Sequence, residues 1–281
     1  MNKTILFLPL AVVLLAFMSC MGSGKKIVDV EELHLQDSID SANDTLHLIQ
    51  DDPEPPQAVD ELFDDFFYTF TSNSSFQLSR VSFPLQCYEG SVKKEITRDD
   101  WQQFNRFSTQ DLYAVIYETD TDMELQKDTS INTVSVEWIY LQDNYVETYV
   151  FRRFQSKWVL KEVNISDIDD LPNGNFLKFY ARFVSDSTHQ VEAIKVPLKL
   201  TITDDADADY QHDTLLNVSD WFDMQAEMPI PQEALVNIDY GQPNESNWHK
   251  NLLLEGFSNG LAVKFKFRKE YGEWKLFGIE N

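Results

Sequence analysis

The chain has 281 residues, of which 43% are hydrophobic and 13% aromatic, and it carries a formal charge of −24 at pH 7. This length is about twice that of a typical domain of ~150 residues, so we expect two modest domains with packed cores. The negative charge argues against binding to nucleic acid or to anionic lipid surfaces, whose phosphates would repel it, and leaves cationic ligands and basic partners open.

The first twenty residues have the pattern of an export signal. Lys3 precedes an apolar run over residues 5–17, and small or flexible residues follow before Cys20. This predicts a signal peptide over residues 1–19. A cysteine at the end of the run resembles the lipobox of bacterial lipoproteins, where the sulfur receives a diacylglycerol, so Cys20 is the predicted lipidation site. An apolar run this short is not expected to remain as a membrane span. The alternative to a lipoprotein signal is therefore an ordinary secretory signal that is cleaved nearby, with Cys20 incidental.

Residues 20–56 are predicted to form a lipidated acidic tether. The segment is rich in Asp and Glu, has lysine only at Lys25 and Lys26, and ends in Pro-Glu-Pro-Pro. This composition is typical of a solvated linker. Cys87 is the only other cysteine, so no disulfide framework exists, and we expect Cys87 to be a small buried residue rather than a nucleophile.

Residues 63–85 recur as residues 176–198, 113 positions later and without a gap. Each copy begins with apolar residues at helical spacing and continues into a segment of alternating apolar residues, which predicts a helix that covers a strand. The matching positions include Phe63/Phe176, Phe66/Phe179, Phe70/Phe183, Gln77/Gln190, Pro84/Pro197 and Leu85/Leu198.

The repeat predicts two units, residues 57–168 and 169–281. In the first, a second helix is expected from Thr97, followed by strands over residues 112–118, 132–141, 145–154 and 158–164. In the second, Asp220-Trp221 matches Asp100-Trp101, and a strand over residues 196–202 precedes an acidic insertion, residues 203–209, which we expect to be a surface loop.

The insertion places Asp205, Asp207 and Asp209 at the spacing of the first ligands of a calcium-binding EF-hand loop. Tyr210 stands where the turn glycine should be, and Leu216 stands where a bidentate Glu should be. We therefore expect a solvated acidic loop and predict no metal site.

The order helix, strand, helix and antiparallel meander, ending in Trp158-x-Leu160 and Trp274-x-Leu276, resembles the nuclear-transport-factor-2-like (NTF2-like, or cystatin-like) fold. The resemblance covers nearly all of residues 57–281 and implies an α+β fold of two tandem units, each with helices packed on a bent antiparallel sheet. The lipobox, tether and tandem units together resemble an uncharacterised family of Gram-negative bacterial lipoproteins with a domain of unknown function. That resemblance implies a lipid-anchored place in the cell envelope, periplasmic or on the cell surface, and no reaction.

Enzymes with this fold, as the resemblance implies, are chiefly isomerases and dehydratases that use an Asp or His base with Tyr or Asp donors. The counterparts here would be Asp65 or Asp100 as the base and Tyr68 or Tyr113 as the donor, but no pair is spaced to suggest a catalytic dyad. We therefore expect no catalytic residues and no cofactor, and a non-catalytic binding or scaffold module, with a small-molecule isomerase or hydrolase as the alternative. A carboxylate and a tyrosine converging in an open pocket, with the carboxyl pKa well above ~3.9, would favour the enzyme.

The expected partner is an unknown protein or a small apolar or cationic ligand. Aromatic side chains near the predicted sheet and helices supply candidate pocket walls. The candidate ligand-binding residues are Tyr68, Trp101, Tyr113 and Tyr140.

Overall fold

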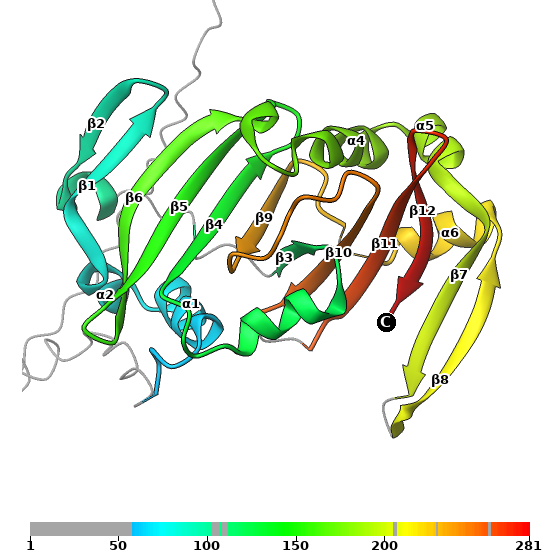
Figure 1. Ribbon diagram of the computed structural model, residues 1–281, viewed down its shortest axis with the longest axis horizontal. Coiled ribbons are helices and arrows are strands. Elements are labelled where there is room, and N and C mark those ends of the chain that lie inside the picture. Colours follow the sequence, from blue (N-terminus) through cyan, green and yellow to red (C-terminus); the bar gives the residue numbers. More distant parts are fainter. Residues whose placement is uncertain (1–57, 103–106, 108–111, 205–206, 229, 258–259) are drawn as a thin grey trace, which may run out of the picture. The chain divides into compact units, whose positions relative to one another are not determined.

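The computed structural model describes residues 58–102, 107, 112–204, 207–228, 230–257 and 260–281 (Figure 1). Residues Asp52–Asn281 form one compact unit. The predicted signal peptide, Cys20 and the tether lie outside the described residues. No helix within the described ranges is long and apolar enough to cross a membrane.

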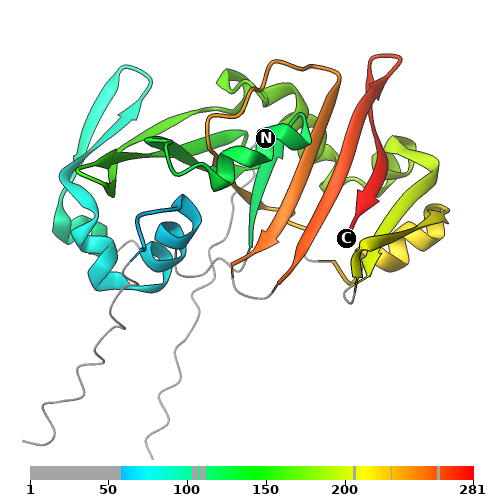
Figure 2. The same cartoon turned by 60° about the horizontal axis from the view of Figure 1, so that its bottom comes forward.

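The fold is a mixed α+β fold built on one large bent sheet. Its strand order is β2-β1-β6-β5-β4-β9-β3-β10-β11-β12-β7-β8, and the β1–β2 and β7–β8 hairpins lie at its two ends (Figures 1 and 2). The strands are β1 (Val81–Glu89), β2 (Val92–Ile96), β3 (Leu112–Tyr117), β4 (Thr133–Tyr140), β5 (Tyr145–Phe154), β6 (Lys157–Asp167), β7 (Ile194–Asp204), β8 (Asp207–Leu216), β9 (Ala234–Asp239), β10 (His249–Gly256), β11 (Ala262–Glu270) and β12 (Glu273–Glu280).

The helices follow the repeat that the sequence shows. Each copy of the repeated stretch forms a long helix and then a short one, so the expectation of a single helix before the strand missed the short helix. Asn73 and Asp186 start these short helices by accepting hydrogen bonds from backbone N–H groups of their first turns. The helices are α1 (Phe63–Ser72), α2 (Ser74–Ser79), α3 (Arg98–Gln102), η3 (Asp120–Lys127), η4 (Ile168–Asp170), α4 (Gly174–Ser185), α5 (Ser187–Ala193) and α6 (Val218–Gln225).

Two hairpins depart from the sequence expectation. The acidic residues 203–209 do not form a free loop, because β7 runs to Asp204 and β8 begins at Asp207, leaving only a short connection outside the described residues. β2 and β8 were not predicted as strands because β2 and the described side chains of β8 are almost all exposed and lack the apolar alternation of a half-buried strand.

The pairing at the centre of the sheet joins the two halves of the chain. β3 pairs antiparallel with β10, and β9 pairs antiparallel with β4. β3 and β9 meet in parallel at one residue pair, Ala114 and Asn237. Strands from before and after residue 168 therefore alternate in one continuous sheet. The expected boundary between two units at residue 168 stays a prediction.

The register of the strands is the same in the two halves. Val81 pairs with Leu160 as Ile194 pairs with Leu276. Both meanders also have a register shift at the same place, at Phe151 in β5 and at Phe267 in β11. These equivalent positions differ by 113 residues in the first strand and by 116 in the meander.

Two apolar cores lie on opposite faces of the sheet. Tyr113, Val115 and Tyr117 belong to the core that contains α1, whereas Ala114 and Ile116 belong to the core that contains α4. Alternating residues of a strand point to opposite faces, so α1 and α4 cover different faces and the central strands are buried on both.

The α1 core is an aromatic cluster around Phe151. The ring centroids of Phe63, Phe66 and Phe70 lie 5.4, 5.7 and 5.2 Å from that of Phe151. Phe267 has the same surroundings on α4, where the rings of the other repeat copy lie 5.3 to 5.7 Å away. The repeated phenylalanines thus place both helices on the sheet in the same way.

We expect Phe66→Ala to destabilise the protein by about 3–5 kcal/mol, because Phe66 is 0% exposed and its loss leaves a cavity. Phe179→Ala, at the matching but half-buried position, should cost less. Urea denaturation would measure both, with Phe154→Ala at an exposed position as the control, expected to change stability by less than about 1 kcal/mol. A Phe66→Ala variant as stable as the control would contradict the packing described.

Candidate functional site

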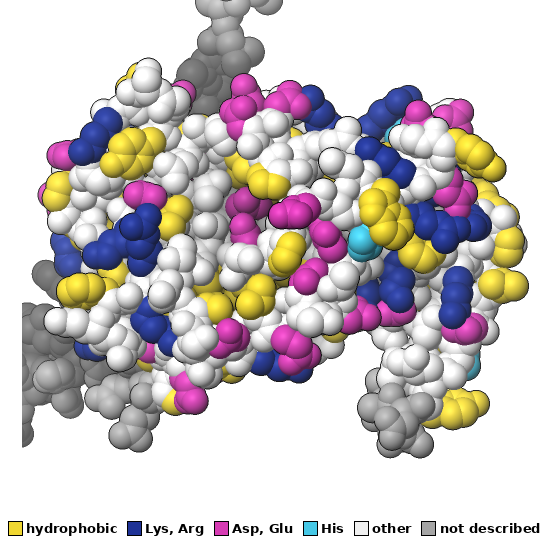
Figure 3. Space-filling model, viewed as in Figure 1, with side chains coloured by type: hydrophobic (Ala, Val, Ile, Leu, Met, Phe, Trp, Pro, Cys, Tyr) yellow, Lys and Arg dark blue, Asp and Glu magenta, His cyan; other side chains and the backbone are white. Residues whose placement is uncertain are grey.

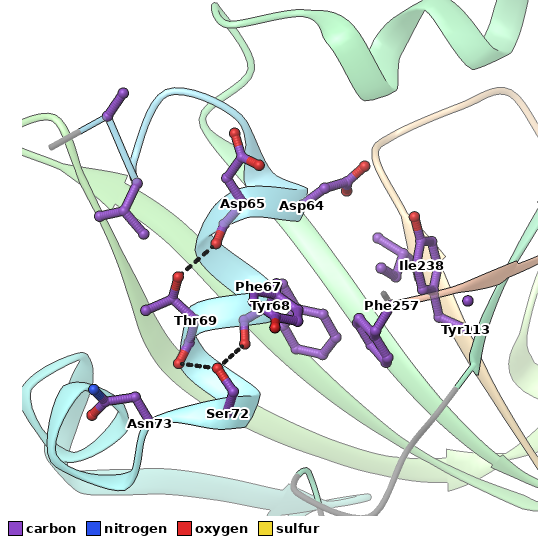
Figure 4. Close-up of a pocket in the computed structure, with 13 residues that line it drawn as sticks. Asp64, Asp65, Phe67, Tyr68, Thr69, Ser72, Asn73, Tyr113, Ile238 and Phe257 are labelled. Atoms are coloured by element: carbon purple, nitrogen blue, oxygen red, sulfur yellow. Dashed lines mark hydrogen bonds between the residues drawn. The ribbon is translucent and has the colours of Figure 1, made fainter. Parts of the chain in front are cut away.

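A pocket of about 580 Å³ lies between α1 and the central strands (Figure 4). We call it the α1 pocket. The helix contributes one wall, while β3, β9, β10 and the residue after β10 contribute the other. Its lining includes Asp64, Asp65, Phe67, Tyr68, Thr69, Ser72, Asn73, Tyr113, Ile238, Gly256 and Phe257.

A chain of hydrogen bonds adjoins the α1 pocket through Asp64 and Tyr113, and we call it the Asp64 network. The Tyr240 hydroxyl donates to Oδ1 of Asp64, and Gln126 Nε2 lies 2.7 Å from Oδ2 of the same carboxylate. Gln126 Nε2 also lies 3.1 Å from Oε2 of Glu255 and 3.3 Å from the Tyr113 hydroxyl. Figure 4 shows Asp64 reaching toward Tyr113, while Asp65 points away from it.

Burial controls the electrostatics of this network. It raises the pKa of Asp64 to about 6, against the opposing effect of the hydrogen bonds from Tyr240 and Gln126, and the nearby charges of Glu255 and Asp65 add to the rise. Burial, followed by the charges of Asp64 and Glu255, also raises the pKa of Tyr113. Burial also raises the pKa of Tyr240 well above its ordinary value. The phenols therefore remain hydrogen-bond donors, and the pKa of Asp64 lies well above its ordinary value.

The pairing of the central strands brings the residues of the network together. Asp64 lies in the first turn of α1, where the partial positive charge of a helix N-terminus favours a carboxylate. Because β3 pairs with β10, Tyr113 stands directly opposite Glu255. Tyr240 directly follows β9, which pairs with β4. The site is thus shared between residues from both halves of the sequence.

The same positions in the second half of the chain are apolar. The repeat relates Asp64 to Leu177, and the cross-strand pair Tyr113/Glu255 corresponds to Leu235/Ile139. Leu177, Leu235 and Ile139 are at most 1% exposed in the core that contains α4. The fold does not need polar residues at these positions, so the Asp64 network points to a function at the α1 pocket.

The α1 pocket contains some of the residues proposed from sequence. Tyr68 and Tyr113 line it, and so does Asp65, the proposed alternative base. Sequence reasoning missed Asp64, Gln126, Tyr240 and Glu255. Asp64 could have been considered from sequence, because it lies beside Phe63 of the apolar helical stripe and next to Asp65. The other three residues reach the site only through tertiary contacts.

The two remaining candidate residues lie elsewhere. Tyr140 stacks on Tyr145, with ring centroids 4.3 Å apart, and lines neither the α1 pocket nor the second pocket. Trp101 is 2% exposed and borders that second pocket, of about 460 Å³, with Cys87, Glu147 and Tyr149. There the Tyr149 hydroxyl donates to Glu147 over 2.7 Å, and Cys87 is buried, as expected, with its thiol pKa raised by that burial.

Asp100, the other proposed base, has a structural role. Its carboxylate accepts hydrogen bonds from the hydroxyl and backbone N–H of Thr97 at the start of α3, and these lower its pKa. It also borders the second pocket. No group of His, Cys, Asp and Glu side chains in the described part of the chain is placed to hold a metal ion. The side chains of Asp205, Asp207 and Asp209 lie outside that part.

Charge is unevenly distributed over the face shown in Figure 3. Asp and Glu side chains occupy the middle of this face, and Lys and Arg side chains gather over β7, β11 and β12. Several of these basic residues are already paired, including Lys199 with Asp213 and Lys266 with Glu280.

Comparison with known proteins supports the fold but supplies no activity. The profile of a family described as "Domain of unknown function (DUF4348)" matches residues 41–281. The structure is similar to the crystal structure of an NTF2-like protein from Bacteroides fragilis NCTC 9343, with a TM-score of 0.72 and 36% identity over 81% of this chain and 98% of that chain. Among curated proteins, nothing matches the sequence.

Asp64 should make stability depend on pH. Because its folded-state pKa of about 6 exceeds the unfolded value near 4, the folded state holds the proton more tightly. The part of the stability that depends on Asp64 should therefore fall as pH rises from about 4 to about 6, by up to about 3 kcal/mol, and level off above. Asp64→Asn should remove this part of the slope.

Denaturant titrations of both proteins at several pH values would test this. The difference between wild type and Asp64→Asn isolates Asp64 from Glu137, a second buried carboxyl whose pKa burial raises to about 7. Parallel pH profiles would show that Asp64 titrates normally.

Proposed function

The chain belongs to the DUF4348 family, whose description names no activity, and we propose its function from the geometry of the site. It is a non-catalytic binding or scaffold module whose α1 pocket holds a small apolar or cationic ligand. The observation that carries this proposal is the pocket of about 580 Å³, which has aromatic walls and a buried polar end that the matching position of the second half lacks.

We further propose that residues 57–168 and 169–281 are tandem NTF2-like units that have exchanged their third strands. The same element order, the same strand registers and the same register shift occur in both halves. In each half the strand after the third α-helix, β3 after α3 and β9 after α6, pairs with the meander of the other half. On this proposal the α1 pocket belongs to one unit but needs strands of both.

We propose that the protein is located in the cell envelope. A signal peptide over residues 1–19, lipidation of Cys20 and a flexible acidic tether over residues 20–56 would anchor the folded unit to a membrane, facing the periplasm or the cell surface. Support comes from the order of charge, apolar run and cysteine in the sequence.

Radiolabelled palmitate should mark the wild-type protein, and the Cys20→Ala variant should lose the label and appear in the soluble fraction. The reason is that the acyl chains alone would hold the protein on the membrane. A variant that keeps the label would show that Cys20 is not the lipidated residue.

Acid–base catalysis is the second candidate, because Asp64 meets part of the condition for an enzyme: its pKa is about 6 and it touches a tyrosine. The tyrosine it touches, Tyr240, is 3% exposed and is not among the residues lining the pocket. Both oxygens of Asp64 already accept hydrogen bonds from the protein, which favours binding over chemistry. In this candidate Asp64 replaces Asp65 or Asp100 as the base, with Tyr113 as donor. Conversion of a bound molecule by wild type but not by Asp64→Asn would favour the enzyme.

A molecule bound in the α1 pocket should co-purify with the protein from envelope membranes and be identified by mass spectrometry. Ser72→Trp should abolish its recovery, because a large ring at this exposed lining position fills the pocket. Val92→Trp, at an exposed position on β2, is the matched control and should retain the molecule. Recovery of no molecule from wild type, or equal recovery from both variants, would contradict the proposal.

A further inference from the structure

We infer that the α1 pocket takes a ligand with a primary ammonium group, and that the side-chain amide of Gln126 occupies the ammonium position when the pocket is empty. The inference rests on the proposed function of the pocket and adds the chemical class of its ligand. It comes from the geometry around one nitrogen atom, from the charge of its neighbours and from the walls of the pocket.

Three oxygen atoms surround Gln126 Nε2. They are Oδ2 of Asp64 at 2.7 Å, Oε2 of Glu255 at 3.1 Å and the Tyr113 hydroxyl at 3.3 Å. A primary amide nitrogen has two hydrogens, so it cannot donate to all three oxygens at once. An ammonium group has three hydrogens and would satisfy every acceptor from the same point.

The charge at this point is also unbalanced. The two charged neighbours that most affect Asp64 are Glu255 and Asp65, both carboxylates that repel its negative charge. The Gln126 amide is neutral and leaves this repulsion in place. An ammonium ion there would form charge-assisted hydrogen bonds to Asp64 and Glu255, which are roughly twice as strong as neutral ones.

The walls of the α1 pocket suit an apolar body attached to the ammonium. The ring of Phe257 lies 5.8 Å from that of Phe67 and 5.0 Å from that of Tyr113, centroid to centroid. Aromatic faces attract cations as well as apolar groups. An arylalkylamine therefore matches both the end and the sides of the pocket.

The side chain of Gln126 is placed so that it can move away from Asp64, Glu255 and Tyr113. It is half-buried, and its helix η3 has no fully buried residue. Its side chain can rotate away without opening the apolar core. Two of its three partners, Asp64 and Tyr113, line the pocket, so its departure extends the cavity toward Glu255.

The binding experiment compares 2-phenylethylammonium with 2-phenylethanol, a neutral probe of similar shape, by isothermal titration of the purified protein. We expect the ammonium to bind at least about tenfold more tightly than the alcohol, since only the ammonium offers charge and three donors. Gln126→Ala should tighten ammonium binding several-fold by removing the competing amide. Asp64→Asn should weaken it by about tenfold or more.

A second variant places the ammonium in the protein itself. Gln126→Lys should raise Tm by a few degrees and abolish binding of the ammonium probe, because the lysine occupies the same position. Gln126→Met, of similar length and without charge, is the control and should do neither. Lower stability of Gln126→Lys than of Gln126→Met would contradict the inference.

The outcomes separate the inference from the proposed function. Equal affinity for the two probes, or absence of binding by the ammonium, would overturn the ammonium class. The α1 pocket as a binding site would still be judged by the molecule recovered from wild type and lost in Ser72→Trp. Loss of that difference would overturn the proposed function itself.

Discussion

The pairing of the central strands β3 and β9 with strands far away in the chain is the constraint on which the rest of the structure depends. β3 and β9 have most of their side chains buried, so their backbone groups need partners within the protein. Each finds them in the meander of the opposite half, through the β3–β10 and β9–β4 ladders. Between β3 and β9, which share one backbone pair, side-chain amides bond the backbone instead. Asn237 Oδ1 accepts from the Ile116 N–H over 3.0 Å, and Gln242 Nε2 donates to the Ile116 carbonyl over 3.0 Å. These ladders join both halves of the chain in one sheet.

Buried carboxyl groups lie on both sides of this junction. On the α1 face, Asp64 is held by Tyr240 and Gln126; on the other face, Glu137 accepts a hydrogen bond of 2.8 Å from Asn237 Nδ2. Burial raises the pKa of both carboxyls, to about 6 and about 7. Burying a carboxyl is costly unless it is hydrogen-bonded or protonated, so these groups weaken the junction as pH rises. Only the network on the α1 face adjoins a pocket described above.

The two halves differ in the side chains at matching positions: polar groups and pockets occur in the first half, and apolar core residues occur in the second. The second pocket repeats the pattern of the first, since Glu147 and Tyr149 correspond to Val263 and Phe265 in the second half. Those counterparts belong to the apolar core around α4. A repeat whose second copy fills these positions with apolar side chains gains packing there, while the first copy keeps cavities and polar groups. This division is the physical reason for assigning function to the first half.

Sequence alone determined the parts of this protein that depend on local periodicity. The repeated phenylalanines fixed α1 and α4, and alternation identified β4, β5 and β6 close to their observed bounds, because side-chain spacing along one segment reports which face is buried. The comparison bears out the mixed α+β, NTF2-like character. The exposed strands β2 and β8 escaped detection because nothing is buried on either side to impose a pattern.

Only the tertiary structure decided which strands pair and which polar residues meet. Tyr113 was a candidate from sequence, but its partner Glu255 lies in the other half and faces it only because β3 pairs with β10. Asp64 and Asp65 both line the pocket and differ by about 100° of helical rotation, and only Asp64 is placed to accept hydrogen bonds from Tyr240 and Gln126. Gln126 comes from a helical segment with no fully buried residue, and only its three contacts reveal its place. Contacts between residues far apart in the chain leave no periodic trace in either segment, so the site emerged from the fold.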